Sequence, residues 1–401
     1  MAGWRPGQVA PGHPGQVLLG LLAVSPDPCR AELSAAQWDM IDGIAEQHRL
    51  QPLLHSRNRD GAHVPPAILA RWADARRAWA AVALVQRAEL QRTVRLLEDA
   101  GLHPVALKGA WLAWHVYPEP GLRPLRDLDL LLPAHEAIAA HDLLGAHGYR
   151  SEEARELSLA DSLALDKHLP PLLSPRGVTI ELHHRLWEID GRMDHMAPEA
   201  DEQAFLRRCE RTGGVLFPCP QDMLVHLIVH AAYDHRLDCG GLVLSDIAGL
   251  LRRHAIDWPE FWRDADRRGY RRGAQTLLAM VATHHDPEAR VQWDGGRPEI
   301  PPDILTAAAR LLFQDLATRR SAGVYATARA AGWQRFWRRI RARRGATAAA
   351  GTTGRDLAAS GGYLSWAIGR LRRTVRQFAR PAVMIQGRDL ATMSRWLDGQ
   401  A

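Results

Sequence analysis

Two aspartates separated by one leucine are the residues of this chain whose type and spacing best suit chemistry. Asp127 and Asp129 are followed by the apolar run Leu130–Leu132. Side chains at i and i+2 of an extended segment point to the same face, so the two carboxylates stand side by side. Carboxylates held this close repel each other unless a divalent cation lies between them. The apolar run indicates a buried strand with the acids at its mouth, and the pattern predicts Mg²⁺ or Mn²⁺ beside a phosphate group.

A lysine and a glycine upstream supply the other half of a phosphate site. Lys108 and Gly109 end a short strand expected over His103–Leu107 and open a helix. Glycine lets the backbone approach a ligand closely, and the first N–H groups of a helix attract anions. Lys108, Arg123 and Arg126 are the cations expected to hold phosphates, because charge-assisted bonds to phosphate are strong. For the two arginines, pairing with an aspartate or fixing the turn is the alternative interpretation.

The order of these features resembles the nucleotidyltransferase superfamily that includes DNA polymerase β. The resemblance is carried by a strand ending in a glycine turn, a helix, and a strand with Asp-x-Asp. The longer pattern LKG…Y…R…RDLDLLL is similar to a bacterial family of uncharacterised nucleotidyltransferases. The motifs cover Leu107–Leu132, with further matches to about residue 250. The chain departs from the superfamily at Gly109-Ala110, where Gly-Ser or Gly-Gly is usual, and in its long gap to Asp127.

That resemblance implies both a fold and an activity. The expected fold is α+β, with a small mixed sheet of the polymerase β-like type and large helical N- and C-terminal parts. The expected activity is metal-dependent transfer of a nucleotidyl group from a nucleoside triphosphate such as ATP to an acceptor. The residues leave the acceptor open, and a role in biosynthetic tailoring of a peptide, a sugar or another small product is implied by resemblance only. A non-catalytic nucleotide-binding or regulatory protein is the alternative, against which a full set of three acids argues.

The third acid is expected on a later strand. Val178 to His183 alternate apolar and polar residues after a Ser-Pro-Arg-Gly turn, which indicates the second strand of a hairpin with Glu181 beside His183. The superfamily brings a third carboxylate to the Asp pair on such a strand, and Glu181 is the matching position. The alternative interpretation is a surface Glu on an edge strand, with Asp161 or Asp166 as the next candidates.

A histidine-rich helical segment follows. His226 and His230 are four residues apart and therefore share one face of a helix. The resemblance implies a pocket for the acceptor or for the base of the nucleotide. The residues expected to line this pocket are His183, His230, His235 and Asp246. A zinc site or an HD-type hydrolase site built from His226, His230, His235 and Asp246 is a further alternative. The absence of an HD dipeptide or an HExxH motif from the segment 222–254 argues against it.

Changes in composition, together with stretches rich in proline, glycine and small residues, divide the chain into four expected parts. They are a helical region (1–101), the catalytic core (102–190), a helical domain (191–290), and a basic helical region (291–401) with a flexible stretch over 345–362. The four cysteines lack metal-site spacing and fit a reducing cytoplasm. The run Val17–Val24 is too short to span a bilayer and is interpreted as a buried helix, with a signal peptide as the minor alternative.

The C-terminal region is strongly basic. Between Arg319 and Arg380 there are fifteen arginines and one acidic residue. This asymmetry points to an anionic partner such as nucleic acid or a membrane surface, but such a partner is not the favoured interpretation, and a solvated helical surface is the alternative. An apolar stripe at helical spacing, Leu364 to Phe378, predicts an amphipathic helix. Packing of that helix onto the helical domain is favoured over membrane insertion.

Overall fold

The computed structural model describes residues 14–25, 33–61, 63–151, 158–187, 198–319, 321–323, 325–326 and 380–400, without the side chains of 198–202. The chain separates into two compact units, Met1–Ile300 and Pro301–Ala401. The four-part division expected from the sequence stays a prediction. The expected flexible stretch over 345–362 and the amphipathic helix over 364–378 lie outside the described residues.

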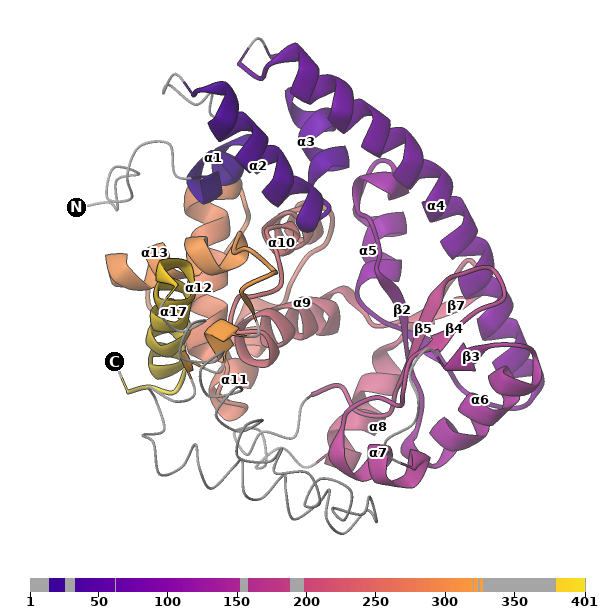
Figure 1. The fold of residues 1–401 in the computed structure, drawn as a ribbon. Coiled ribbons are helices and arrows are strands. Elements are labelled where there is room, and N and C mark those ends of the chain that lie inside the picture. The colour runs from indigo at the N-terminus through magenta and orange to yellow at the C-terminus, as the bar shows by residue number, and fades with distance from the viewer. Residues whose placement is uncertain are drawn as a thin grey trace, which may run out of the picture. The chain divides into compact units, whose positions relative to one another are not determined.

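A seven-stranded mixed sheet forms the centre of the first unit, so the expected α+β class is confirmed (Figure 1). Its strand order is β3-β4-β5-β2-β1-β7-β6. β2 pairs in parallel with β5, β1 pairs in parallel with β7, and the remaining neighbours are antiparallel. The strands are β1 (Val105–Ala106), β2 (Asp127–Leu131), β3 (Arg150–Ser151), β4 (Leu172–Leu173), β5 (Thr179–His183), β6 (Glu210–Thr212) and β7 (Val215–Phe217).

The central strands β2 and β5 follow the alternation expected from the sequence. Leu128, Leu130, Ile180 and Leu182 are all at most 1% exposed and form the apolar face of the pair. Asp129 lies directly opposite Glu181 in the parallel register. Because side chains alternate between faces, the acids of both strands share the other face. The register therefore decides that the two carboxylates meet.

Three strands were not expected from the sequence: β3, β6 and β7. Each contains only two or three residues, too few to give a period-2 pattern. The β6–β7 hairpin did carry a signal, because its turn is Gly213-Gly214 and both glycines have positive φ (58° and 84°). Such a Gly-Gly pair is favoured in tight hairpins. These two strands extend the sheet into a segment that the sequence had assigned to a helical domain.

Among the described residues, four helices precede the sheet: α1 (Pro14–Leu22), α2 (Ala35–Gln47), α3 (Gln51–Asn58) and α4 (Pro66–Asp99). The longest, α4, runs along one side of the unit and packs against α3 and against α6 (Ala134–Ala146), a helix beside the sheet (Figure 1). It stops where the sequence predicts, because Gly101 adopts φ 79° and Leu102 N–H then donates to the carbonyl of Leu97 at 3.0 Å. This layer positions the connection between α2 and α3 near the acids of β2, as described below.

The remaining helices of the first unit cover the sheet and follow it. Those beside the sheet are α5 (Gly109–His115), η2 (Pro120–Leu122), α6 (Ala134–Ala146), α7 (Leu159–Leu165) and α8 (Pro198–Arg208). Those after it are α9 (Pro220–Val229), η3 (His230–Asp234), α10 (Leu242–Arg253), α11 (Trp258–Arg267), α12 (Arg271–Met280) and η4 (Val281–His285). η3 and η4 are single π-helical turns, which occur often at functional sites.

In the second unit the described helices are α13 (Pro302–Leu312) and α17 (Pro381–Leu397). They are joined by a bidentate ion pair, in which both contacts between Arg310 and Asp389 measure 2.7 Å. Asp389 is buried, so this pair fixes how the two helices pack. Within the described residues, no helix is both long and apolar enough to cross a membrane.

Candidate active site

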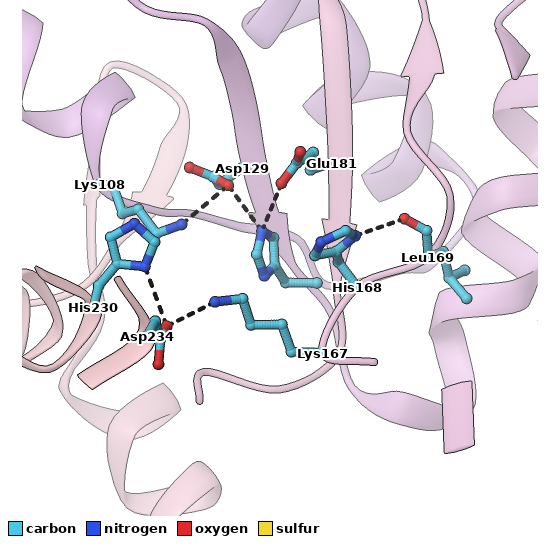
Figure 2. A network of polar contacts seen from close by, with 9 residues as sticks. Lys108, Asp129, Lys167, His168, Leu169, Glu181, His230 and Asp234 are labelled. Atoms are coloured by element: carbon cyan, nitrogen blue, oxygen red, sulfur yellow. Dashed lines mark hydrogen bonds and ion pairs between the residues drawn. The ribbon is translucent and has the colours of Figure 1, made fainter. Parts of the chain in front are cut away.

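Three ligand-bearing side chains converge on the polar face of β2 and β5. Asp129, Glu181 and His183 each offer one atom, and these atoms lie within 4.8 Å of one another. His183 Nε2 is 2.8 Å from Asp129 Oδ1 and 3.4 Å from Glu181 Oε2 (Figure 2). In the part of the chain that the structure describes, this is the one set of three such residues close enough to hold a metal ion. The strand of Glu181 lies beside that of the aspartates, so the substitutes Asp161 and Asp166 are not needed.

Asp129 is the most strongly held of the acids. It also accepts a hydrogen bond from Lys108 Nζ at 3.2 Å, and its side chain is only 7% exposed. Burial alone would raise the pKa of this carboxyl, but Lys108 and His183 outweigh burial and bring it well below its usual range. Burial also acts to raise the pKa of Glu181, but the His183 hydrogen bond together with the charges of His168 and His183 outweighs it, and that pKa is lowered. Both acids are therefore carboxylates at neutral pH.

Asp127 differs from Asp129 although it lies on the same face of the same strand. Burial, followed by the charges of Asp129 and Glu181, raises the pKa of Asp127 to about 7. Lys108 and His183 act in the opposite direction but do not cancel this effect. The acids thus carry more negative charge than the neighbouring cations neutralise, and a divalent cation would relieve the excess. Oxygen ligands suit Mg²⁺ and Mn²⁺, so the donor set fits such an ion.

The turn after β1 holds Lys108 in a strained conformation. Its φ of 41° and ψ of −112° are rare for a residue with a side chain. Gly109 follows, and a Cβ placed there would lie 2.5 Å from Arg123 Nη1 and 2.7 Å from Leu125 Cδ2. A side chain at 109 would therefore displace Arg123 or Leu125, a reason for glycine that the sequence did not reveal. The strain at Lys108 directs its ammonium group to Asp129.

Arg123 and Asp246, both expected in the site, are bonded to each other. Arg123 Nη2 donates to Asp246 Oδ2 at 3.0 Å, and Tyr117 OH donates to Asp246 Oδ1 at 2.8 Å. Burial raises the pKa of Tyr117 well above its usual value, and the Asp246 charge raises it further. Of the two roles considered for Arg123, pairing with an aspartate is the one present in this structure. The pair ties the turn before β2 to α10.

Arg126 is exposed. A second arginine near it, Arg49, was missed by sequence reasoning. Arg49 lies between α2 and α3, has φ 55°, and places its guanidinium carbon 5.7 Å from the centre of the Trp79 ring. Burial lowers the pKa of Arg49, the charge of Arg126 lowers it further, and Asp127 opposes the shift. Arg49 and Arg126 therefore lie close to Asp127. No motif marks Arg49, because it reaches this place only through the packing of the helical layer.

The histidines of α9 and η3 lie near Lys108, whose positive charge adds to burial in lowering the pKa of His226 and His230. His226 and His230 stack at 6.0 Å between ring centroids, as their spacing of four predicts, and His235 meets His230 edge-on at 4.3 Å. His230 Nδ1 lies 3.2 Å from Asp234 Oδ2, which also accepts from Lys167 Nζ at 2.7 Å. Asp246 is engaged with Arg123, and within the described residues these histidines form no three-ligand metal set. The zinc alternative therefore lacks its geometry.

A comparison with families of known proteins bears on these observations. The model of a family described as "uncharacterised nucleotidyltransferase" matches residues 34–285. The chain belongs to this family. Comparisons with curated proteins and with solved structures find no match.

Membership makes this protein a nucleotidyltransferase enzyme, and the matched range has a structural meaning. It includes the sheet, the turn at Lys108, and the histidines of α9 and η3. It also includes α2, α3 and α4, and thus Arg49, whereas α1 lies outside the matched range. Lys167 and Asp234 were missed by sequence reasoning. The spacing of four between His230 and Asp234 could have indicated that pair, whereas nothing near Lys167 pointed to it.

Proposed function

We propose that this nucleotidyltransferase transfers a nucleotidyl group from a nucleoside triphosphate to an acceptor, with Mg²⁺ or Mn²⁺ held by Asp127, Asp129 and Glu181. The observation that carries the proposal is the convergence of Asp129, Glu181 and His183 beside an Asp127 carboxyl whose pKa is raised by burial and by its acidic neighbours. We also propose that the sheet is of the polymerase β-like type. The parallel pairing of β2 with β5, which brings the acids together, supports this.

In this proposal, one histidine and four basic residues around the acids have the following roles. His183 holds Asp129 and Glu181 together through its Nε2 atom. Lys108, Arg49 and Arg126 hold the phosphates, since each lies close to the acids and carries a positive charge. Arg123, bonded to Asp246, fixes the turn from which Arg126 and Asp127 extend. When bound, the divalent cation would supply neutralisation of the charge that develops on the phosphates.

The proposed function is tested by release of pyrophosphate from a mixture of nucleoside triphosphates. Purified protein with Mg²⁺ or Mn²⁺ is expected to release pyrophosphate, and excess chelator is expected to abolish the release. Mass spectrometry of the products then identifies the nucleotide and any modified acceptor added as an extract of small metabolites and peptides. Metal-dependent nucleotide binding without any turnover would instead support the non-catalytic alternative.

Lys108→Ala is expected to weaken binding of a nucleoside triphosphate by about tenfold or more, because it removes a charged contact to phosphate. Titration calorimetry measures the affinity, and thermal unfolding shows whether the fold survives. Gly109→Val is expected to unfold the local turn, since its side chain would clash with Arg123 and Leu125. Unchanged affinity in both variants would remove this turn from the phosphate site.

The acceptor remains a matter of proposal. A tailoring role on a peptide, a sugar or another small biosynthetic product follows from the resemblance alone. The basic segment between Arg319 and Arg380, considered for nucleic-acid or membrane binding, lies almost wholly outside the described residues and stays a prediction.

A further inference from the structure

A second polar cluster lies near the acids, on η3 and on the segment between α7 and β4. We name it the His230 cluster: His230, Asp234 and Lys167. Asp234 Oδ2 lies 3.2 Å from His230 Nδ1 and 2.7 Å from Lys167 Nζ. Figure 2 shows the His230 ring beside the Lys108 side chain, whose ammonium group donates to Asp129. The cluster thus lies next to the proposed metal and phosphate site. The function proposed above assigns no role to its three residues.

The cluster fixes the tautomer of His230. An ionised Asp234 can only accept, so the hydrogen bond at Nδ1 places the ring proton on that nitrogen and leaves Nε2 with a lone pair. Lys167 Nζ donates to the Asp234 carboxylate at 2.7 Å and orients it, and the two side chains are only 8% and 6% exposed. The His230 side chain is 21% exposed. Of the three side chains, His230 is therefore the one that a second substrate can reach.

The surroundings keep His230 neutral. Burial lowers its pKa well below the usual value, and the positive charge of Lys108 lowers it further. His226, one turn earlier, stacks on His230 and is buried, and neither of its ring nitrogens has a hydrogen-bond partner among the described residues. The π-helical turn η3 begins at His230 and lets His230 and Asp234 meet on one side. A neutral imidazole with an oriented lone pair is the form that accepts a proton.

We propose that His230 is the general base for the acceptor, and that the acceptor is a neutral alcohol; this rests on the proposed nucleotidyl transfer. The acceptor oxygen forms a bond to the α-phosphorus while the bond from that phosphorus to the oxygen bridging to the β-phosphate breaks. Pyrophosphate leaves with the electron pair of the broken bond. The hydroxyl proton moves to Nε2 of His230 and from there to water. Asp234 and Lys167 are positioning residues, because they act through His230.

The charges of the cluster favour an alcohol over an ionised acceptor. Lys108 is assigned to the phosphates of the nucleotide and Lys167 is paired with Asp234, so neither ammonium group beside His230 is assigned to an ionised acceptor. A phosphate or carboxylate acceptor would arrive charged and without need of a base. An alcohol loses its proton only with difficulty at neutral pH, and a positioned base typically contributes about a hundredfold or more to such a step.

The test compares a neutral acceptor with an ionised one. ATP labelled in its α-phosphate is incubated with Mg²⁺ or Mn²⁺ and either glycerol or inorganic phosphate, and the labelled products, including those of hydrolysis by water, are quantified. His230→Gln is expected to lower transfer to glycerol and water by about a hundredfold while changing transfer to phosphate less than about threefold. Asp234→Asn is expected to show the same selectivity, and Asp234→Glu to restore part of the loss.

His284→Gln serves as the matched control, because His284 also lies in a π-helical turn, η4, of the first unit. It is expected to leave both reactions unchanged. An equal loss with both acceptors in His230→Gln, or no loss with either, would overturn the role of His230 while nucleotidyl transfer by the wild type stands. Wild-type protein that shows no metal-dependent turnover with any acceptor would overturn the proposed function, and the role of His230 with it.

Discussion

Asp129→Asn is expected to lower metal-dependent pyrophosphate release by at least about a hundredfold, equivalent to about 3 kcal/mol of transition-state stabilisation. The substitution keeps the shape of the side chain but removes the charge that Lys108 and His183 contact. An amide oxygen is a poorer ligand for a divalent cation than a carboxylate. Binding of Mn²⁺, followed by its electron spin resonance signal, is expected to weaken in parallel. Asp127→Asn is expected to have an effect of similar size.

Asp161→Asn is the control for this prediction. Asp161 was an alternative third acid, and its side chain is exposed at the start of α7, where its oxygen accepts from Ser158. Its substitution is expected to leave turnover and Mn²⁺ binding unchanged. Near-normal turnover in a folded Asp129→Asn protein would show that the metal assignment is wrong.

Asp246→Ala is expected to reduce the free energy of unfolding by about 3 to 5 kcal/mol, because it leaves a buried charge without its partner. Asp246 is 2% exposed and accepts from both Arg123 and Tyr117. Removing the carboxylate leaves the Arg123 guanidinium and the Tyr117 hydroxyl unsatisfied in the interior. Urea denaturation followed by circular dichroism measures the change.

The ion pair between Arg211 and Glu98 is the matched comparison. At 2.7 Å it is shorter than the buried Arg123–Asp246 pair at 3.0 Å, but its side chains are 52% and 30% exposed. Glu98→Ala is therefore expected to cost less than about 1 kcal/mol. If Asp246→Ala is as stable as the wild type but binds nucleotide less tightly, Asp246 belongs to a ligand pocket, as the sequence first suggested, and not to the framework.

The predictions for Asp129 and Asp246 differ because the structure places these two similar residues in different surroundings. Asp129 and Asp246 are both acids near apolar segments, and both were expected in the site. The acid of β2 lies among others on one face of a strand pair, where charge accumulates. The acid of α10 lies against an arginine and a tyrosine that satisfy it. The side chains that surround each acid therefore distinguish a proposed metal ligand, Asp129, from an acid that stabilises the fold, Asp246.

The sequence alone determined the features that depend on neighbours along the chain. The Asp-x-Asp pair, the strand of Glu181 with its turn, the end of α4 at Gly101 and the shared face of His226 and His230 all follow from local periodicity or from the conformational freedom of glycine. The family to which the chain belongs was also visible in these motifs. Such signals survive because a strand or a helix fixes the direction of its side chains whatever it packs against.

The tertiary structure alone decided which distant residues meet. Pairing of β2 with β5 brings Glu181 and His183 to Asp129 across more than fifty residues, as the Asp129–His183 contact shows. Packing of the helical layer brings Arg49 towards Asp127, and α9 with η3 brings His230 and Asp234 to Lys167. Short strands such as β6 and β7 exist because the sheet offers them partners. These contacts depend on burial and register across the whole core, which no local pattern encodes.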